Sequence, residues 1–356
     1  MKVTGPEQTV PDRLIEIIIP NWNGEQMLEC CLASLQKQNC ANFSVTVVDN
    51  GSEDESVQRI ERDFPHVKVI QLDQNTGFAH AVNVGIEKSE APWILLLNND
   101  MEIAPDCLFQ LEAGINRYRT YDFFALKMMS FQNRELLDGA GDGVLRGGVG
   151  YRIGTMEKDD GRYSKDRDCF GACGGAALYS RSFFERTGLF DADFFAYLED
   201  VDLNLRARRR GLSCRYLASA VIYHIGSGTT GSRINPLTIQ LSTRNNLRVL
   251  VKNYTLVFLV KSLLPLLAYQ IAWFVFCVKK GQSVPWVKGV IDGLKLLPES
   301  FAKRKEILIS GMSIAESDFS RQIVASESEV INSIMSRRAA EGKNNCLLKV
   351  YQKVFC

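Results

Sequence analysis

Carboxylates that could bind a metal ion or accept a proton occur at two places in the chain. Asp100 ends the run WILLLNND, residues 93–100, in which an apolar segment delivers a carboxylate at its carboxyl end. Hard cations such as Mg²⁺ prefer oxygen ligands and typically take one or two protein carboxylates together with substrate phosphates. Glu199, Asp200 and Asp202 follow an aromatic-rich stretch and form the second concentration of acids. A carboxylate there could accept a proton from an incoming hydroxyl if it faced a cleft.

Both clusters also have a purely structural interpretation. The sequence LLLNND at 95–100 is compatible with a polar transition from a strand to a turn. Acids in the first turn of a helix that begins near Asp200 are stabilised by the helix dipole. Asp202 is also spaced for an i,i+4 ion pair with Arg206. Residue types and spacing therefore leave both interpretations open.

His224 is the third candidate, because the chain has three histidines and this one lies two residues before the glycine-rich sequence at 226–228. Imidazole is a good ligand for Mn²⁺ and similar ions and a poorer one for Mg²⁺. A core histidine that is hydrogen-bonded to the backbone is the structural alternative. We interpret His66 and His80 as structural.

The elements that must position these residues alternate between strands and helices. Short apolar runs predict four strands, at 14–19, 43–48, 67–72 and 93–97, and helical spacing predicts helices between them, at 26–38, from Asp54 onward and through 81–87. This alternation indicates a parallel, doubly wound α/β sheet, in which ligands bind outside the carboxyl ends of the strands. Each strand ends in a polar cluster (PNWNG, DNGS, NTGF or NND), so we expect the four clusters to converge on one edge of the sheet.

A glycine-rich segment follows, at about 130–165, and contains DGAGDGVLRGGVG. This composition favours an irregular, mobile stretch. We assign no site residue to it.

The segment Tyr254–Val278 is strongly apolar and carries one charge, Lys261. Its uncharged part, 262–278, lies at the low edge of the roughly 17–25 residues that span a bilayer. Lys279-Lys280 and Trp286 suit the boundary between lipid and water. Peripheral contact with a membrane is our main interpretation, and core packing, contact in a homo-oligomer and a true span are the alternatives.

Overall composition narrows the class of protein. The 42 Lys and Arg residues balance 41 Asp and Glu residues, and a net charge of +1 argues against a nucleic-acid partner. A hydrophobic content of 46% excludes a disordered chain, and a mean hydropathy of −0.07 is too low for a multispan membrane protein.

Cysteines and the N-terminus bear on location. The ten cysteines show no disulfide-framework or zinc spacing, and Cys169 and Cys173 lie one residue too far apart for a CxxC motif. We expect them to be buried or loop thiols. Residues 1–13 contain no apolar signal segment. A reducing, cytoplasmic location fits both observations.

Seven segments, in order, resemble family-2 glycosyltransferases of the GT-A fold, and most of all their rhamnosyltransferase-like branch: IIIPNWNG, VVDNGS, NTGFAHAVNVGI, WILLLNND, GGAALYSR, GLFDADFFAYLEDVDLNLRARRRG and VIYHIGSGT. The likeness spans about Leu14 to Leu250. It implies a GT-A catalytic domain at 1–250, with a Rossmann-like, mostly parallel sheet flanked by helices. A helical, membrane-associating region would follow at 251–356.

The resemblance also implies an activity. The enzyme would be a metal-dependent, inverting glycosyltransferase that makes cell-surface polysaccharide at the cytoplasmic face of the membrane. It would move a sugar, with rhamnose as one candidate, from a dTDP-, UDP- or GDP-sugar to a glycan or lipid-linked acceptor. A single displacement needs no protein nucleophile, and the chain offers no convincing nucleophilic triad.

By resemblance, the donor would contact Pro20, Asn21, Asn23, Asp49, Asn75, Gly77, Asn98 and Asn99. Among these, Asp49 is similar to the carboxylate that reads the pyrimidine base. The segment 98–100 is similar to the DxD element, with Asp100 as a ligand of Mn²⁺ or Mg²⁺ and His224 as a further ligand. Glu199-Asp200 matches the catalytic ED pair, in which Asp200 would be the base.

Two departures from the family pattern matter. Asn98 replaces the first acid of DxD, which lowers the charge of the metal site. The QxxRW motif of processive synthases is missing, because Gln240–Arg244 has the wrong spacing and no Trp. A polymer-extruding synthase is therefore disfavoured.

Two alternative functions fit the sequence less well than sugar transfer. A sugar nucleotidyltransferase would need a Gly-rich, Lys- or Arg-bearing loop after the first strand, and PNWN at 20–23 is not one. A catalytically inactive membrane scaffold is disfavoured by the intact Asp100, Asp200 and His224.

Overall fold

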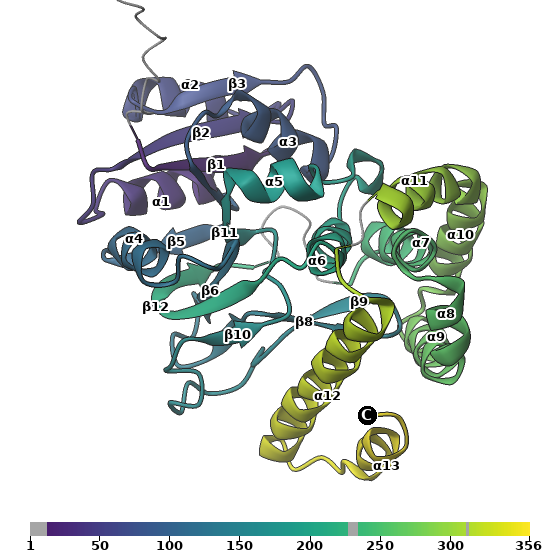
Figure 1. The fold of residues 1–356 in the computed structure, drawn as a ribbon. Helices are drawn as coiled ribbons and strands as arrows, with labels where there is room; N and C mark the ends of the chain where they lie inside the picture. Colours follow the sequence, from purple (N-terminus) through teal and green to yellow (C-terminus); the bar gives the residue numbers. More distant parts are fainter. Residues whose placement is uncertain (1–12, 227–233, 311–312) are drawn as a thin grey trace, which may run out of the picture.

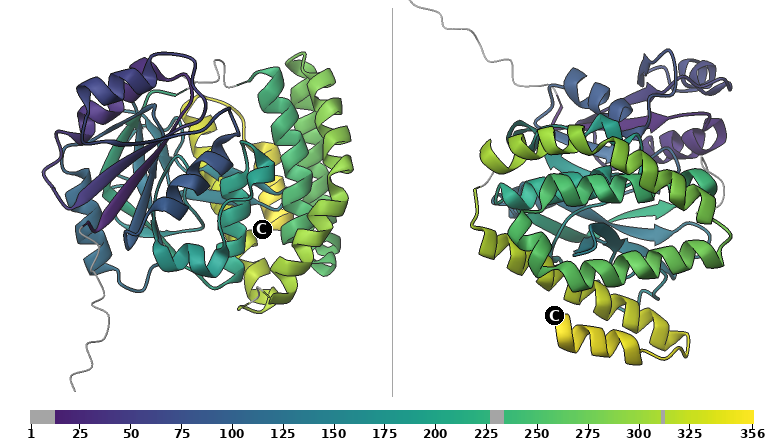
Figure 2. Two further views of the ribbon diagram at one scale, coloured as in Figure 1. Left: turned by 90° about the horizontal axis from the view of Figure 1, so that it is seen from above. Right: turned by 90° about the vertical axis from the view of Figure 1, so that its right-hand side faces the viewer.

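The computed structural model describes residues 13–226, 234–310 and 313–356 (Figure 1). It consists of a central sheet with helices on both faces and a layer of C-terminal helices to one side, as the view from above in Figure 2 shows. The sequence observations on residues 1–12 and on Ser227-Gly228 lie outside the described residues.

Ten strands in the described residues form one mixed sheet, in the order β10-β12-β6-β11-β4-β1-β2-β3, with β5 paired to β12 and β7 to β6. The strands are β1 Ile15–Asn21, β2 Phe43–Asp49, β3 Lys68–Gln71, β4 Trp93–Leu97, β5 Met101–Ile103, β6 Phe123–Ser130, β7 Leu137–Ala140, β10 Arg167–Cys169, β11 Ala176–Ser180 and β12 Cys214–His224. The four predicted strands pair in parallel as β4-β1-β2-β3. Beyond them the direction is mixed, because β11 runs antiparallel to β4 and β6 while β12 is parallel to β6.

Helices cover both faces of this sheet: α1 Glu25–Leu35, α2 Ser56–Asp63, α3 Phe78–Lys88, α4 Cys107–Arg117, α5 Arg181–Thr187 and α6 Glu199–Arg209. Side chains of β1 alternate between two cores because successive residues of a strand point to opposite faces. Ile17 and Ile19 pack with α1 and α4, and Ile18 packs with α3. α5 and α6 belong to the same core as Ile18.

The glycine-rich segment is only partly irregular: residues 137–152 form strands, which corrects the expectation there, and residues 153–165 consist mainly of turns and bends. It forms β7 and a hairpin of β8 (Asp142–Leu145) and β9 (Val149–Arg152). The long C-terminal helix α12 (Glu316–Ala340) holds it in place, since Ser326 Oγ accepts from Val144 N at 2.8 Å and Ser333 Oγ accepts from Gly154 N at 2.9 Å. Contacts from more than 170 residues away therefore decide this structure.

The remaining C-terminal helices are α7 Pro236–Asn253, α8 Leu256–Lys261, α9 Leu263–Lys279, α10 Ser283–Lys295, α11 Leu297–Ser310 and α13 Cys346–Phe355. The apolar segment 254–278 is thus divided between α8 and α9 at Ser262. None of the helices in the described ranges is long and apolar enough to cross a membrane. The boundary placed at residue 250 falls inside α7, and the division into two regions stays a prediction.

Candidate functional site

Side chains at the carboxyl ends of the parallel strands meet, as the strand pattern predicts. Asn21, the last residue of β1, donates from Nδ2 to Asp49 Oδ1 at 3.0 Å and accepts at Oδ1 from Asn99 Nδ2 at 2.7 Å. Asn50 continues the chain of contacts by donating from Nδ2 to Asn75 Oδ1 at 3.1 Å. The four polar clusters therefore form one connected edge.

The other predicted donor residues lie on the same edge. Pro20 is the sixth residue of β1 and is partly exposed. The backbone N–H of Asn23 donates to Ser52 Oγ at 2.9 Å, which ties the loop after β1 to the loop after β2. Gly77 N donates to Asn75 Oδ1 at 2.9 Å, and Gly77 is the N-cap residue of α3.

Asp100 and His224 are in direct contact. β5 follows Asp100 and pairs antiparallel with the end of β12, so His224 is opposite Met101. His224 Nε2 lies 3.2 Å from Asp100 Oδ2. Its Nδ1 lies 2.6 Å from Oδ2 of Asp138, a residue of β7 that also pairs with Arg152. Burial lowers the pKa of His224, but hydrogen bonds to Asp100 and Asp138 outweigh it and raise the pKa above its ordinary value.

This pair of residues fits a divalent cation. Asp100 Oδ1 is buried and has no hydrogen-bond partner among the described residues, which leaves one carboxylate oxygen available beside an imidazole nitrogen. Oxygen and imidazole nitrogen together suit Mn²⁺. Asp138 would fix the orientation of the His224 ring, as outer-shell carboxylates do for metal-ligating histidines.

Asp200 stands at the N-terminus of α6. Its Oδ2 accepts from Gly174 N at 3.1 Å, and its Oδ1 accepts from Val201 N at 2.8 Å. Burial raises the pKa of Asp200, and these two N–H groups act in the opposite direction. The preceding Glu199 is buried, and in the described structure its Oε2 has no partner. Burial and the neighbouring Asp200 raise the pKa of Glu199 well above its ordinary value.

One short segment connects the two candidate centres. Gly175 O accepts from Asn98 N at 2.9 Å, and the adjacent Gly174 holds Asp200. Asn98 Oδ1 is buried without a partner in the part of the chain that is described. The DxD-like segment and the ED pair are therefore neighbours across Gly174-Gly175.

Asp142 and Cys173 also lie at the site, and the sequence interpretation missed both in this role. The ligand atoms of Asp142, Cys173 and Asp200 all lie within 4.8 Å of one another. Burial, and then the charge of Asp200, raises the pKa of Asp142 to about 8. Burial and these two acids raise the pKa of Cys173 well above its ordinary value, so the thiol stays protonated at neutral pH. Thiolate is the metal-binding form, so this cluster suits a cation less well than Asp100 and His224.

The loop before α6 has a strained backbone. Phe195, Tyr197 and Leu198 have φ values of +62°, +70° and +67°, in a region that non-glycine residues rarely adopt. Asn245 of α7 holds the loop, because its Nδ2 donates to Phe194 O at 3.0 Å and to Tyr197 O at 2.7 Å. No pattern in the sequence pointed to Asn245.

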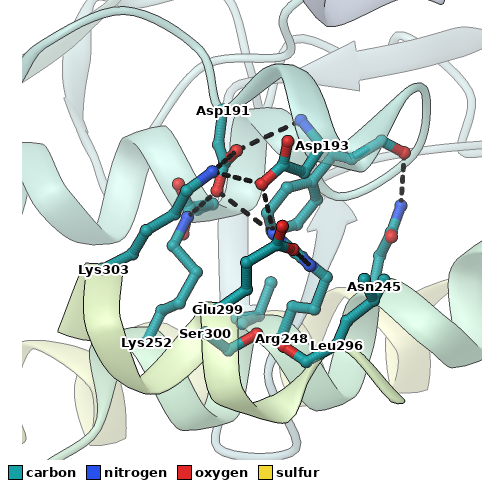
Figure 3. Close-up of polar contacts among 12 residues, drawn as sticks. Asp191, Asp193, Asn245, Arg248, Lys252, Leu296, Glu299, Ser300 and Lys303 are labelled. Carbon is teal, nitrogen blue, oxygen red and sulfur yellow. Dashed lines mark hydrogen bonds and ion pairs between the residues drawn. The ribbon is translucent and has the colours of Figure 1, made fainter. Parts of the chain in front are cut away.

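An ion-pair network joins the residues on either side of this loop to the C-terminal helices (Figure 3). Lys252 Nζ lies 2.6 Å from Asp191 Oδ2 and 2.8 Å from Asp202 Oδ1. Asp202 also pairs with Arg206 at 2.9 Å, as its i,i+4 spacing predicts. Lys303 of α11 binds Asp191 at 2.5 Å. Asp202 is therefore a structural member of the acidic cluster.

Comparisons with known proteins identify relatives by sequence and by fold. Residues 16–188 match the model of glycosyl transferase family 2. The chain is 33% identical over 94 residues to the teichoic acid poly(glycerol phosphate) polymerase of Staphylococcus epidermidis, a match that covers 25% of this chain and only 13% of the polymerase. It is 25% identical over 240 residues to the N-acetylglucosaminyl-diphospho-decaprenol L-rhamnosyltransferase of Mycobacterium tuberculosis, covering 61% of this chain and 78% of that enzyme.

Solved structures share the fold. The 1–349 fragment of S. aureus TarS superposes with a TM-score of 0.53 and 18% identity, covering 88% of this chain and 90% of that one. GalNAc-T7 with UDP, GalNAc and Mn²⁺ superposes with a TM-score of 0.55 and 18% identity, covering 67% of this chain and 48% of that one. At these identities the likeness establishes the fold, which is GT-A.

Proposed function

The chain belongs to glycosyl transferase family 2 and has the GT-A fold, and from this premise we propose that it is an inverting glycosyltransferase. It takes a sugar from a nucleotide-diphospho-sugar and transfers it to a hydroxyl of a glycan or lipid-linked acceptor. The product belongs to a cell-surface polysaccharide or glycolipid.

The position of Asp200 carries this proposal. Gly174 presents an N–H to its Oδ2, and Gly175 contacts the segment that leads to Asp100. A base beside a cation site fits a reaction in which a hydroxyl attacks the sugar on one side while the diphosphate leaves on the other. Asp200 accepts the proton of the acceptor hydroxyl. One displacement then inverts the anomeric centre.

Asp100 and His224 would hold the divalent cation, Mn²⁺ or Mg²⁺. A cation bound there offsets the negative charge that grows on the leaving diphosphate. Other side chains would bind the rest of the donor. Asn21 contacts both Asp49 and Asn99, and it so fixes the segments after β2 and β4 that would enclose the nucleotide.

The similar proteins suggest candidates for donor and acceptor. The mycobacterial relative is named as a rhamnosyltransferase that acts on an N-acetylglucosaminyl-diphospho-decaprenol, which favours rhamnose as the sugar and a lipid-linked acceptor, and dTDP-rhamnose is one donor to test. The TarS structure has been solved with UDP, so UDP-sugars belong in the same test, together with GDP-sugars. With a lipid-linked acceptor, the proposed site of action is the membrane surface, and we propose its cytoplasmic face.

The substitution Asp200→Asn in the full chain tests the proposal. A thermal-shift panel of dTDP-, UDP- and GDP-sugars with Mn²⁺ or Mg²⁺ first identifies the donor, because a ligand of the folded state raises the melting temperature. Loss of the base should lower kcat by about 10²–10⁴-fold. Donor affinity should be largely preserved.

The control is Asp63→Asn, which removes an exposed acid that pairs with Arg62. It should keep wild-type turnover and donor affinity. Turnover by Asp200→Asn close to the wild-type value would refute its role as the base. An active wild-type enzyme also excludes the inactive scaffold.

A further inference from the structure

The helices α8, α9 and α10 carry many exposed apolar side chains. Fourteen large hydrophobic residues between 256 and 294 are exposed, among them Val260, Leu264, Ile271, Phe274, Val284 and Ile291. Leu264 and Ile271 are exposed by 64% and 62%. Exposed apolar side chains scattered singly are normal in soluble proteins, but a concentration of them on neighbouring helices is typical of an interaction site.

We propose that the exposed face of these helices docks the enzyme on the surface of an anionic lipid bilayer, with the helices lying on the membrane. The inference deepens the proposed function by naming its membrane partner, and it rests on that function for the lipid-linked acceptor alone. The docking itself can be measured without any activity.

The inner faces of these helices are fixed to the rest of the protein. Gln270 Nε2 of α9 donates to Asn246 Oδ1 at 2.7 Å, and Trp273 Nε1 donates to Thr243 Oγ1 at 3.0 Å. In α10, a Cβ on Gly289 would lie 2.5 Å from Gln240 O, so α10 and α7 pack backbone to backbone. The helices therefore have a packed side and an unpacked side.

Charge favours a lipid surface over a second copy of the chain. Residues 256–295 contain five lysines and one acid, Asp292. That acid is already engaged, because its Oδ2 accepts from Gln240 Nε2 at 2.8 Å. Lysines near a bilayer attract anionic headgroups while their stems cover apolar surface. Two copies that met through this face would bring their lysines together.

The docking face is connected to the candidate site. A Cβ on Gly147 would lie 2.5 Å from Tyr269 Cγ, so α9 packs directly on the tip of the β8–β9 hairpin. The same hairpin carries Asp142 and Arg152. An enzyme docked through α9 would hold this hairpin near the bilayer, where a lipid-linked acceptor is found.

Vesicle flotation of the full chain tests the inference. Vesicles of phosphatidylcholine with about one-third phosphatidylglycerol should bind the wild-type protein, and pure phosphatidylcholine vesicles should bind it less. The double variant Leu264→Glu/Ile271→Glu should lower the partition coefficient by at least about tenfold, because it places two charges in the apolar face. Lys279→Gln/Lys280→Gln should lower binding to the anionic vesicles by up to about fivefold for each lysine removed.

Phe109→Glu is the matched control. Phe109 is 56% exposed on α4, which packs on the sheet face opposite α6. This variant should bind vesicles like the wild type, and circular dichroism should show all variants folded. Unchanged vesicle binding by Leu264→Glu/Ile271→Glu would overturn the inference. It would also be overturned if the wild-type protein bound no vesicles and formed a dimer that this double variant converted to a monomer. Turnover on a water-soluble acceptor should be retained by the double variant, so failure of docking and failure of the glycosyltransferase proposal are told apart.

Discussion

Asn21 shows how much of this site depends on single side chains. One amide group contacts both Asp49 and Asn99, and it is almost completely buried. An amide can donate and accept at the same time, so Asn is the residue type that can satisfy a carboxylate on one side and an amide on the other. Asp at this position would place two carboxylates in contact.

Asp100→Ala should remove the dependence of donor binding on Mn²⁺. Calorimetry of the wild type should show donor affinity at least about tenfold higher with Mn²⁺ than without it, since loss of a metal contact typically costs that much or more. The variant should bind the donor equally in both conditions. Equal wild-type affinity with and without Mn²⁺ would contradict the metal site.

Asp142→Asn should stabilise the protein at neutral pH. Burial raises the pKa of Asp142 from 3.8 to about 8, so the folded state binds its proton more tightly than the unfolded state. Stability is therefore lost as the pH rises from about 4 to about 8. A neutral amide avoids this loss, and the melting temperature should be at least about 4 °C higher than that of the wild type at pH 8.

Calorimetric scans at pH 4 and pH 8 check this prediction. The difference between variant and wild type should nearly vanish at pH 4, where Asp142 is protonated in the folded state and close to half protonated in the unfolded state. An equal difference at the two pH values would contradict it. Turnover should fall, because a carboxylate kept at the expense of stability is expected at a functional site.

At the scale of elements, the position of Asp200 depends on α7, which follows it in sequence by more than thirty residues. Asn245 holds the loop 194–198, whose backbone strain would otherwise relax. Such strain costs of order 1–3 kcal/mol for each residue and persists only where the surroundings fix it. The contact from Asn245 thus positions the acidic cluster, and the spacing of the acids in the sequence does not predict this contact.

Lys252→Met should weaken the contact between α7 and the residues on either side of this loop. Lys252 is buried between Asp191 and Asp202, and removing one member of a buried ion pair is destabilising by about 3–5 kcal/mol. Burial raises the pKa of Asp191, but Lys252 and Lys303 outweigh burial and lower the pKa below its ordinary value. The ionised form of Asp191 therefore stabilises the fold above about pH 4. This contribution disappears as the pH falls through the lowered pKa.

Urea unfolding at pH 7 and at lower pH measures the effect. The difference between wild type and Lys252→Met should be largest at pH 7 and should shrink below pH 4. Lys261→Met, on the exposed surface of α8, is the matched control and should unfold like the wild type. A pH-independent difference would show that lost packing accounts for the change.

At the scale of the whole molecule, the C-terminal helices complete the packing around the candidate site. Phe319, Ile323 and Val330 of α12 are fully buried. Arg146 of the hairpin pairs with Glu327 of the same helix. Full burial of three such side chains contributes about 1.5–3 kcal/mol each, which approaches the total stability of about 5–15 kcal/mol of an ordinary domain.

A chain truncated after Asn253 should therefore fail to fold cooperatively. It would lose α12 and expose the hairpin that carries Asp142 and Arg152. Circular dichroism and thermal melting of the truncated chain measure this directly. A sharp melting transition close to that of the full chain would show that residues 13–253 form an independent domain.

The local pattern of the sequence determined the first half of the sheet. Apolar runs at 14–19, 43–48, 67–72 and 93–97 are confirmed as β1 to β4, because short apolar runs bounded by turn residues are typical of strands. The polar clusters that follow these strands converge because the carboxyl ends of parallel strands lie at one edge of the sheet. Asn21, Asp49 and Asp100 could be located in this way.

Tertiary structure decided the rest. Asp138, Asp142 and Arg152 come from short strands in a glycine-rich segment, and these strands form only because β6 and α12 pack against them. Asn245 donates to backbone carbonyls of the loop before α6, and the residues next to Asn245 in the sequence do not predict these hydrogen bonds. Local periodicity reports which face of an element is buried, but contacts between residues a hundred or more positions apart depend on the whole fold.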